Sequence, residues 1–500
     1  MSPFQNKKIF TADINQVGFS PKWDGLKICV LLPDYSTTDI DYQHYDPPRD
    51  LSQLIPGAFF EQVFLNKLTT YKQLKDLGKK EFDIFVNLCE GYLEWEVPSI
   101  DVIYSLELLN LPFTGPTSLL YDPPKELMKY VAYTEGILTP SYTLIENEEN
   151  IEAECKHLRY PLFVKPHKAG DSLGVDEKSL VDNLPGLKEK IRSTIDEYSP
   201  LLVEEYISGR EFTVMLAANA GNESVTVFRP VEYIFPEGNA FKTYALKTSE
   251  LHPDANIPVL DEVLNEQLKA AAEKIFSAFN GAGFARLDFR MNEKGELFFL
   301  EINFTCSVFY TKGYEGSADY ILQHDGFGQA NFLKHIIDEG IERHRKRQKK
   351  YGIKGNSIAG FGIYACQNIL PNELIFKGEE MAQRIVTRRH VTENWNSNQK
   401  EIFRKYAYPL SKEVFLLWDS NPNEWAPQNH SCSPNTAFDG LNVKAISNIV
   451  KGDELTLDYA SFLDENMEPF KCQCGTPNCR GLITGITNNS VTEREKQATT

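Results

Sequence analysis

The sequence predicts an α/β protein over its first two thirds and a mostly-β domain over its last third. Apolar strands at 27–32 and 82–88 alternate with helical patterns, which is typical of a parallel sheet. After residue 353 the helical periodicity gives way to short β segments and glycine turns. Several cysteines also gather in this last part, which predicts a small cysteine-rich segment there.

The totals set bounds on the class of protein. A chain of 500 residues with 42% hydrophobic residues is expected to form several domains with sizeable cores. The net charge of −18 argues against broad nucleic-acid binding. The amino-terminal stretch lacks the apolar region of a signal peptide, and no run reaches the ~20 apolar residues of a membrane helix. We therefore expect no membrane partner and a cytoplasmic location, or a nuclear one in a eukaryote.

The first 120 residues predict a small α/β domain. We expect a strand at 27–32, a helix at 51–68 interrupted near Pro56, a strand at 82–88, a helix at 99–109 and a short strand at 111–115. Ligands of parallel sheets bind at the carboxyl ends of the strands. This places Asp34, Glu90 and Glu94 or Glu96 near a candidate site, although these acids also suit solvated loops.

The next segment carries the residue types that hold phosphates. Two prolines after Asp122 open a helix that contains Lys125 and Lys129. A strand at 160–166 ends near Lys165 and leads into a loop of small residues, whose backbone N–H groups can surround a phosphate. A strand–turn–strand pattern follows at 201–214, and its acids could accept hydrogen bonds from an adenine amino group and ribose hydroxyls.

The stretch 285–303 predicts a β-hairpin around a polar loop with a glycine. If the four loop residues are unpaired, Asp288 lies opposite Phe299 and shares a sheet face with Glu301 and Asn303. Two carboxylates and a carboxamide on one face suit Mg²⁺ held against phosphates. Solvated carboxylates on a surface hairpin would give the same pattern, so the neighbouring segments must decide.

Roughly the first 340 residues resemble ATP-grasp ligases of the D-alanine–D-alanine ligase type. The resemblance rests on the strand with its lysine and glycine loop, on V-E-E-Y-I-x-G-R-E-F-T-V at 203–214, and on R-L-D and E-I-N in the hairpin. It implies an α/β ATP-grasp fold, with a parallel α/β amino-terminal domain at 1–120 and two α+β nucleotide-binding lobes at 121–340. The family joins a carboxylate to an amine: the carboxylate attacks the γ-phosphate of ATP, and the amine then displaces phosphate from the acyl phosphate.

The resemblance implies ATP and two Mg²⁺ ions as cofactors, and amino acids or peptides as substrates; a homodimer through this part stays open. The residues implied for ATP are Lys125, Lys165, Gly170, Ser172, Gly174, Glu204, Tyr206, Ile207 and Glu211. Those implied for Mg²⁺ are Asp288, Glu301 and Asn303, and Arg286 is implied as the catalytic residue that stabilises the acyl phosphate. Lys247 falls where the family carries a γ-phosphate lysine on a mobile loop, and Lys242 competes with it for that place.

The segments that would hold the amino acids depart from the family. Its Gly-Gly-x-Ser-x-Glu stretch is replaced by P-D-Y-S-T-T at 33–38, and its T-x-P-G after E-I-N is replaced by F-T-C-S at 304–307. The nucleotide half therefore matches the family while the acceptor half is changed. D-Alanine is not implied as the substrate.

A densely basic run at 341–352 fits a solvated helix end and linker, or a nuclear-targeting or polyanion-binding patch. Four signals follow it in order: a glycine turn and strand at 357–365, N-H-S-C-x-P-N at 429–435, G-D-E-L-T-x-D-Y at 452–459, and C-x-C-x₄-C at 472–479. The three late thiolates are one short of a closed tetrahedral zinc site. Cys432 is the natural fourth because Cys366 lies in an apolar strand, and isolated structural cysteines are the alternative.

Together these four signals resemble a SET-domain lysine methyltransferase with its post-SET zinc motif. The resemblance implies a mostly-β SET domain at 353–466, a post-SET segment at 467–486 and a disordered tail at 487–500. It implies S-adenosyl-L-methionine at Gly360, Phe361, Gly362, Tyr364, Asn429 and His430, and one structural Zn²⁺ at Cys432, Cys472, Cys474 and Cys479. Tyr459 is implied as the catalytic tyrosine that orients the amine of a lysine-bearing protein or another substrate. Leu457 stands where the family often has an aromatic residue, so the degree of methylation stays open.

Three hypotheses follow. The first is a fusion of an active carboxylate–amine ligase with an N-methyltransferase that serves the same pathway or substrate. The second is a protein-lysine methyltransferase whose ATP-grasp part is a nucleotide-dependent module that presents a peptide. The third is a histone methyltransferase with a vestigial first part, which the basic run would suit.

Overall fold

The computed structural model describes residues 23–36, 46–91, 97–168, 174–221, 224–236, 241, 255–356, 360–378, 383–418, 428–463 and 468–485. The chain divides into two compact units, Met1–Arg347 (unit 1) and Gln348–Thr500 (unit 2). Among the residues expected to be functional, Glu94, Glu96, Gly170, Ser172, Lys242 and Lys247 lie outside the described residues, as does the tail at 487–500. Of the helices that the structure describes, none has the length and apolar character that a bilayer crossing requires.

Unit 1 begins with a parallel sheet, as the sequence predicts, and its strand order is β2–β1–β3. Its elements are β1 (Lys27–Pro33), β2 (Phe59–Leu65), β3 (Ile84–Asn87), α1 (Thr70–Leu77) and α2 (Ile100–Leu108). Alternate residues of β1 enter different cores because successive strand side chains point to opposite faces. Val30 packs in the core that includes helix α9 (Gly328–Arg347), whereas Leu31 packs against α1 and α2. The stretch at 111–115 adds only a bridge, between Phe85 and Phe113, to the described part of this sheet.

The helix expected at 51–68 is wrong. Residues 52–58 form turns, and 59–65 form the edge strand β2, which pairs with β1 along its whole length. The sequence of β2, F-F-E-Q-V-F-L, is rich in aromatic and branched residues that favour strands. Pro56 and Gly57 break any helix before it, and the neighbouring strand β1 supplies hydrogen bonds that a short helix could not replace.

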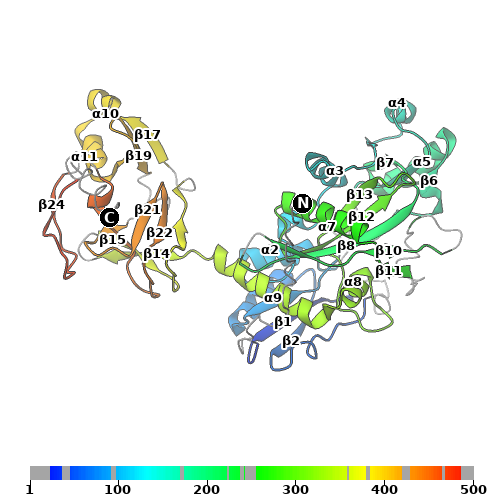
Figure 1. The fold of residues 1–500 in the computed structure, drawn as a ribbon, viewed down its shortest axis with the longest axis horizontal. Coiled ribbons are helices and arrows are strands. Elements are labelled where there is room, and N and C mark those ends of the chain that lie inside the picture. Colours follow the sequence, from blue (N-terminus) through cyan, green and yellow to red (C-terminus); the bar gives the residue numbers. More distant parts are fainter. Residues whose placement is uncertain are drawn as a thin grey trace, which may run out of the picture. The chain divides into compact units, whose positions relative to one another are not determined.

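Two further sheets complete unit 1, and Figure 1 shows them with their helices. The first has the order β4–β7–β5–β6 and the second β11–β10–β8–β12–β13, with β9 paired to β8. The strands are β4 (Tyr142–Ile145), β5 (Leu162–Pro166), β6 (Leu180–Val181), β7 (Leu201–Glu205), β8 (Arg210–Ala218), β9 (Val225–Val227), β10 (Val231–Tyr233), β11 (Asn256–Pro258), β12 (Phe284–Met291) and β13 (Leu297–Asn303). The helices are α3 (Lys125–Thr134), α4 (Ile151–Cys155), α5 (Leu184–Tyr198), α7 (Glu262–Ala278) and α8 (Ser317–Asp325).

The β12–β13 hairpin forms, but with a register that differs from the expected one. Asp288 pairs with Glu301, not with Phe299. Phe289 pairs with Phe299, so Leu300 is the extra residue of a β-bulge in β13. The other face of the hairpin enters the core between this sheet and helices α3 and α7, where Phe289 and Phe299 are both fully buried.

The basic run begins inside helix α9, which ends at Arg347. Arg343 does not fit a solvated helix end, because its guanidinium donates to the backbone oxygens of Phe113 and Gly115 at 2.8 Å each. It also pairs with Glu339 one helical turn earlier, at 3.2 Å. This arginine therefore fastens the helix to the amino-terminal domain.

The described part of unit 2 contains small β sheets, as the change in composition predicts, together with two α-helices. The sheets are β14–β15, β16–β22–β21, β17–β19–β18, β20–β23 and β24–β25. The strands are β14 (Tyr351–Asn356), β15 (Gly360–Ala365), β16 (Leu374–Phe376), β17 (Gln383–Thr387), β18 (Tyr408–Pro409), β19 (Val414–Trp418), β20 (Asn429–His430), β21 (Thr436–Asp439), β22 (Asn442–Ala445), β23 (Thr456–Leu457), β24 (Phe470–Lys471) and β25 (Leu482–Ile483). The helices are α10 (Arg388–Asn394) and α11 (Ser397–Tyr406).

Candidate functional sites

The hairpin of unit 1 brings its acidic residues together on one face. Asp288 of β12 lies directly opposite Glu301 of β13, and Arg286 lies opposite Asn303. Residues that pair in this way have side chains on the same face of the sheet. The bulge is needed for this, because continuing the pairing of Phe289 with Phe299 by one step would set Asp288 opposite an apolar leucine instead.

Cations and donors surround these carboxylates. Asp288 is buried and accepts a hydrogen bond from Thr213 Oγ1 at 2.9 Å, and Arg286 Nη2 lies 3.5 Å from its other oxygen. Lys125 Nζ, buried at the start of α3, lies 3.8 Å from Glu301 Oε2. Asn303 Oδ1 accepts a hydrogen bond from the backbone N–H of Thr305 at 2.8 Å. The set offers hard oxygen ligands beside fixed positive charge, which is what a divalent cation and a phosphate require together.

A second cluster lies on β5, β7 and α3. Glu204 of β7 forms ion pairs with Lys165 of β5 and Lys129 of α3, and each lysine Nζ lies 2.6 Å from a carboxylate oxygen. All three side chains are buried. Lys129 was not among the residues expected to bind ATP, although it lies one helical turn after Lys125 and therefore on the same face of the helix. That spacing is the signal that could have found it.

Glu204 is the counter-ion of both lysines. Burial by itself would raise the pKa of Glu204, but the charges of Lys129 and Lys165 outweigh it and lower the pKa to about 2. A carboxylate with a lowered pKa stabilises the fold at pH values above its ordinary 4.5, and this contribution is lost as the pH falls through 4.5 towards 2.

Replacing Glu204 with Gln is expected to lower the free energy of unfolding of unit 1 by about 3 kcal/mol at pH 7, because it removes this contribution and leaves two buried ammonium groups without a counter-ion. Urea denaturation at pH 7, repeated between pH 5 and 3, measures the loss and its pH dependence. Glu205→Gln is the matched control, since the partner of Glu205 is the exposed Arg159 and such pairs contribute at most about 1 kcal/mol. Equal denaturation midpoints for the two variants would contradict the assigned role of Glu204.

The turn between β7 and β8 holds the remaining residues expected around the nucleotide. Glu211 of β8 accepts two hydrogen bonds from Arg290 of β12, and Ile207 O accepts a third. Arg290 also stacks on the ring of Tyr206. Gly174 is the described end of the glycine loop; it has φ +71°, and a Cβ there would lie 2.8 Å from Pro166 Cγ. Arg290 was not expected at this site, because an arginine on a sheet face suits a solvated position equally well.

A cluster around Arg49 lies at the carboxyl ends of β1 and β3, where the sequence places a candidate site. Arg49 is 1% exposed and pairs with Glu90 at 3.1 Å and Asp46 at 3.3 Å. It also donates to the backbone oxygen of Val308, just after the changed segment at 304–307, and Tyr310 OH donates to Asp46 at 2.9 Å. Burial raises the pKa of Glu90 to about 7, against the opposing charge of the arginine.

Among the acids expected near this site, Glu90 joins the cluster and Asp34 does not. The carboxylate of Asp34 instead caps its own turn by accepting from Ser36 N at 2.9 Å. Local sequence could not reveal Asp46 and Arg49, because the cluster is assembled from segments more than 40 residues apart.

In unit 2, three of the four sequence motifs lie together: the glycine motif of β15, the N-H-S-C motif and the G-D-E-L motif. β20 runs parallel to β23, and Tyr364 of β15 bridges to Glu454. Asn429 Nδ2 donates to Phe361 O at 2.9 Å and to Glu454 Oε1 at 2.7 Å. A Cβ on Gly362 would lie 2.3 Å from that same oxygen, so a larger residue there would displace the Glu454 carboxylate from Asn429. Gly360 has φ +85°, a conformation that also favours glycine.

Tyr459 lies next to this junction and is held at both ends. Its hydroxyl donates to Gln428 O at 2.6 Å, and its backbone N–H donates to His430 Nδ1 at 3.1 Å. Burial raises the pKa of the Tyr459 hydroxyl above its ordinary value, so the hydroxyl stays protonated at neutral pH. Because Nδ1 of His430 accepts, a neutral His430 carries its proton on Nε2, which lies 3.4 Å from Cys432 Sγ.

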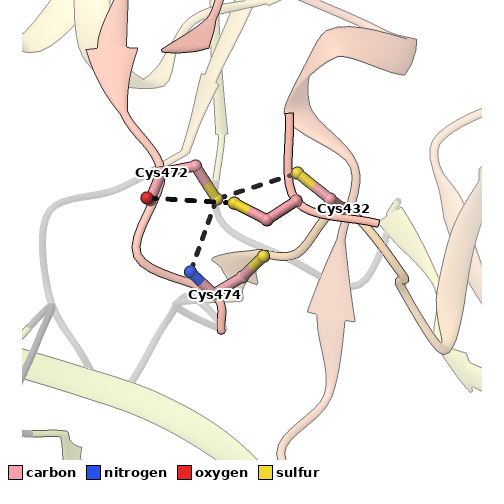
Figure 2. A group of neighbouring side chains, drawn as sticks. Cys432, Cys472 and Cys474 are labelled. Carbon is pink, nitrogen blue, oxygen red and sulfur yellow. Dashed lines mark hydrogen bonds between the residues drawn. The ribbon is translucent and has the colours of Figure 1, made fainter. Parts of the chain in front are cut away.

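The four late cysteines lie together, and Figure 2 labels three of them. The sulfur atoms of Cys432, Cys472, Cys474 and Cys479 all lie within 4.8 Å of one another. The sulfur atoms of Cys432 and Cys472 are 3.7 Å apart, and Cys472 Sγ accepts from Cys474 N at 3.4 Å. Cys366 stays outside this group, but the expected reason was wrong: it follows β15 and is exposed.

Comparison with protein families agrees with both halves of this geometry. The family described as D-ala D-ala ligase C-terminus matches residues 131–311. The SET domain family matches residues 360–460. The first match contains β12 and β13 with their carboxylates, and the second contains β15, β20 and β23 with Tyr459.

Individual relatives are ligases. The chain is 29% identical over 201 residues to the D-alanine–D-alanine ligase of Aquifex aeolicus, which covers 40% of this chain and 64% of that protein. It is 30% identical over 253 residues to the D-alanine–D-alanine ligase of Streptococcus uberis, covering 49% of this chain and 68% of that protein. A crystal structure of D-alanine–D-alanine ligase from Bacillus anthracis complexed with ATP aligns with 65% of this chain and 100% of that chain, at 18% identity and a TM-score of 0.46. The chain therefore belongs to the D-alanine–D-alanine ligase family and carries a SET domain in its last third.

Proposed function

We propose that unit 1 is an ATP-dependent carboxylate–amine ligase and that unit 2 is an N-methyltransferase that uses S-adenosylmethionine. The observation that carries the ligase assignment is the pairing of Asp288 with Glu301 on one sheet face, with the buried Lys125 and Arg286 beside them. Hard oxygen ligands and fixed cations on one sheet face support the binding of a nucleoside triphosphate with its metal ions.

In the proposed ligase the residues act by position and charge. Asp288, Glu301 and Asn303 would hold two Mg²⁺ ions, which neutralise charge on the phosphates. Lys125 and Lys165 would contact the phosphates, and Arg286 would neutralise the acyl phosphate that forms when a carboxylate attacks the γ-phosphate. An amine then displaces phosphate, which gives ADP, phosphate and the new amide.

The acceptor side supports a substrate other than D-alanine. The Arg49 cluster joins the amino-terminal domain to Val308, the residue directly after the changed segment at 304–307. Its arginine is almost fully covered, whereas the side chains of Asp46 and Glu90 are 17% and 15% exposed. The accessible edge of the cluster is therefore acidic, and it favours a substrate that presents an ammonium group.

In unit 2 the proposed methyl transfer uses the junction of β15, β20 and β23. Asn429 and His430, with the backbone of β15, would bind S-adenosylmethionine. The protonated hydroxyl of Tyr459 would orient the target amine for in-line attack on the methyl group, since productive alignment of reactants supplies much of the rate of such displacements. The methyl acceptor is a lysine side chain or another primary amine.

The four cysteines fit one structural Zn²⁺. Tetrahedral thiolate coordination with Zn–S distances of about 2.3 Å requires S–S distances of about 3.8 Å, and the Cys432–Cys472 separation is 3.7 Å. The four thiolates come from the turn after β20 and from residues 472–479 between β24 and β25, so one ion would join two separate segments that pack with Tyr459.

Replacing Cys472 with Ser is expected to remove about one equivalent of zinc per chain, because a closed site needs all four ligands. Residues 468–485 should then become the first site of limited proteolysis. In the wild type, bound zinc and the rate of methyl transfer should fall over the same range of chelator concentration. Metal analysis, proteolysis with mass spectrometry and a methylation assay measure the three effects. Cys366→Ser is the matched control and should keep the metal. Full zinc content in the Cys472 variant would contradict the site.

The experiment that tests the whole proposal gives the full chain ATP, Mg²⁺ and S-adenosylmethionine with a panel of amino acids, peptides and amines. The expected result is substrate-dependent release of ADP and phosphate together with an amide product identified by mass, and a methylated product of one of the amines. Failure to release ADP with any member of a broad panel would overturn the ligase half.

A second candidate function follows from the acceptor segment. Phe304, Cys306, Val308 and Phe309 are buried, and Arg49 fixes this segment to the first domain. A closed acceptor segment also favours a nucleotide-dependent module that presents a peptide for methylation. This alternative predicts nucleotide binding without release of ADP under every substrate condition.

A further inference from the structure

The sheet face that carries Asp288 continues past it to Arg290. Side chains two residues apart on a strand share a face, so Arg286, Asp288 and Arg290 follow one another along β12. In the neighbouring strand β8, Thr213 lies opposite Asp288 and Glu211 lies opposite Arg290. Arg290 and Glu211 thus occupy the next position along the sheet face that carries the proposed metal-binding carboxylates.

Arg290 already holds the two acceptors that the ligase resemblance assigns to the nucleoside. Its Nε and Nη2 donate to Glu211 Oε2 at 3.1 and 2.9 Å, and its Nη1 donates to Ile207 O at 3.0 Å. Its guanidinium carbon lies 4.7 Å from the centre of the Tyr206 ring and 5.5 Å from that of Phe235. The arginine is therefore fixed by hydrogen bonds on its edge and by aromatic rings on its faces.

This arrangement leaves little for a ribose to gain from Glu211. The side chains of Arg290 and Glu211 are 4% and 8% exposed. Both guanidinium donors reach Oε2 of Glu211, so a ribose hydroxyl would meet a buried carboxylate whose charge Arg290 already compensates. A carboxylate whose charge is already compensated by two N–H donors also gains less from one more hydrogen bond than an unpaired carboxylate does.

We propose that Arg290 makes nucleotide binding insensitive to the ribose hydroxyls, so that this site selects its nucleotide by the triphosphate and metal ions instead. The inference rests on the proposed nucleotide site and specifies how that site reads its ligand. The phosphate-binding side has contacts of its own, because Lys125 lies beside Glu301, Lys165 pairs with Glu204, and Asp288 accepts from Thr213.

Calorimetric titration of the full chain with ATP, 2′-deoxy-ATP and 3′-deoxy-ATP in the presence of Mg²⁺ tests this. We expect the three dissociation constants to agree within about threefold, whereas a hydroxyl bound by an unpaired carboxylate would change them by about tenfold or more. In Arg290→Met the carboxylate of Glu211 becomes available, and both deoxy nucleotides should then bind about tenfold more weakly than ATP.

Arg210→Met is the matched control, because Arg210 pairs with Glu232 at the exposed end of β8, on the face opposite to Glu211, and its ratio of dissociation constants should equal that of the wild type. Wild-type binding of ATP more than tenfold tighter than of both deoxy nucleotides would overturn the inference without the need for any variant. An unchanged ratio in a folded Arg290→Met would overturn the role of Arg290. If none of the three nucleotides binds the wild type, the proposed nucleotide site itself is refuted.

Discussion

Replacement of Asp288 with Asn is expected to reduce substrate-dependent release of ADP and phosphate by at least about a thousandfold. Asp288 is buried opposite Glu301 and accepts a hydrogen bond from the hydroxyl of Thr213. An asparagine there keeps the volume of the side chain and loses its charge. A metal ligand that stabilises charge in phosphoryl transfer contributes several kcal/mol, and each 1.4 kcal/mol corresponds to about a factor of ten. A coupled assay for ADP, with the substrates identified by the panel, measures the loss.

The loss should be specific to this carboxylate. Glu293→Gln, in the exposed loop of the same hairpin, removes an equal charge and should leave the rate within about twofold of wild type. Circular dichroism of the Asp288 variant should match the wild type, because the substitution is nearly isosteric. Retention of a tenth or more of the activity would show that Asp288 does not hold a catalytic metal ion.

Tyr459→Phe is expected to lower the rate of methyl transfer by about a hundredfold or more, with a smaller effect on the binding of S-adenosylmethionine. The hydroxyl of Tyr459 is the only atom removed, and it is fixed at 2.6 Å from Gln428 O beside the junction with Asn429 and His430. A misplacement of the reacting amine by about 1 Å commonly costs a hundredfold in rate. Release of S-adenosylhomocysteine under saturating methyl donor measures it.

Tyr351→Phe provides the comparison for this hydroxyl. Tyr351 is a buried tyrosine in β14 of the same unit, and it packs against Phe376 in a different core from Tyr459. Its variant should methylate at the wild-type rate. If both variants lose activity to the same extent, the effect of Tyr459→Phe reflects a general loss of packing, and the catalytic assignment fails.

The parts of the fold that follow from local sequence could be predicted. The buried strands β1 and β3 and the helices α2 and α3 have runs or periods that few alternatives satisfy. The strand β2 was missed because its prediction depends on a neighbour: Phe59 to Leu65 form an edge strand that gains its hydrogen bonds from β1, more than 25 residues away. Local propensity does not contain that information.

The candidate sites show the same division. The four late cysteines belong to a short motif set and lie together in unit 2, and Asp288 and Glu301 belong to short motifs and lie opposite each other in unit 1. Lys129 is marked in the sequence only by its spacing from Lys125, and Arg290 belongs to no motif, so its partner Glu211 reveals its place. Long charged side chains give no sign in sequence of whether they reach solvent or a buried counter-ion.

The bulge at Leu300 and the hairpin loop are two irregularities that cancel. Met291 pairs with Leu297, so five residues form the loop, which by itself would turn Glu301 and Asn303 to the face opposite Asp288. The extra residue in β13 reverses that change of parity. A single insertion or deletion in either place would separate the carboxylates, whereas a matched pair of changes would restore them. The number of residues between Asp288 and Glu301 can therefore change only by an even number if both side chains are to stay on the same sheet face.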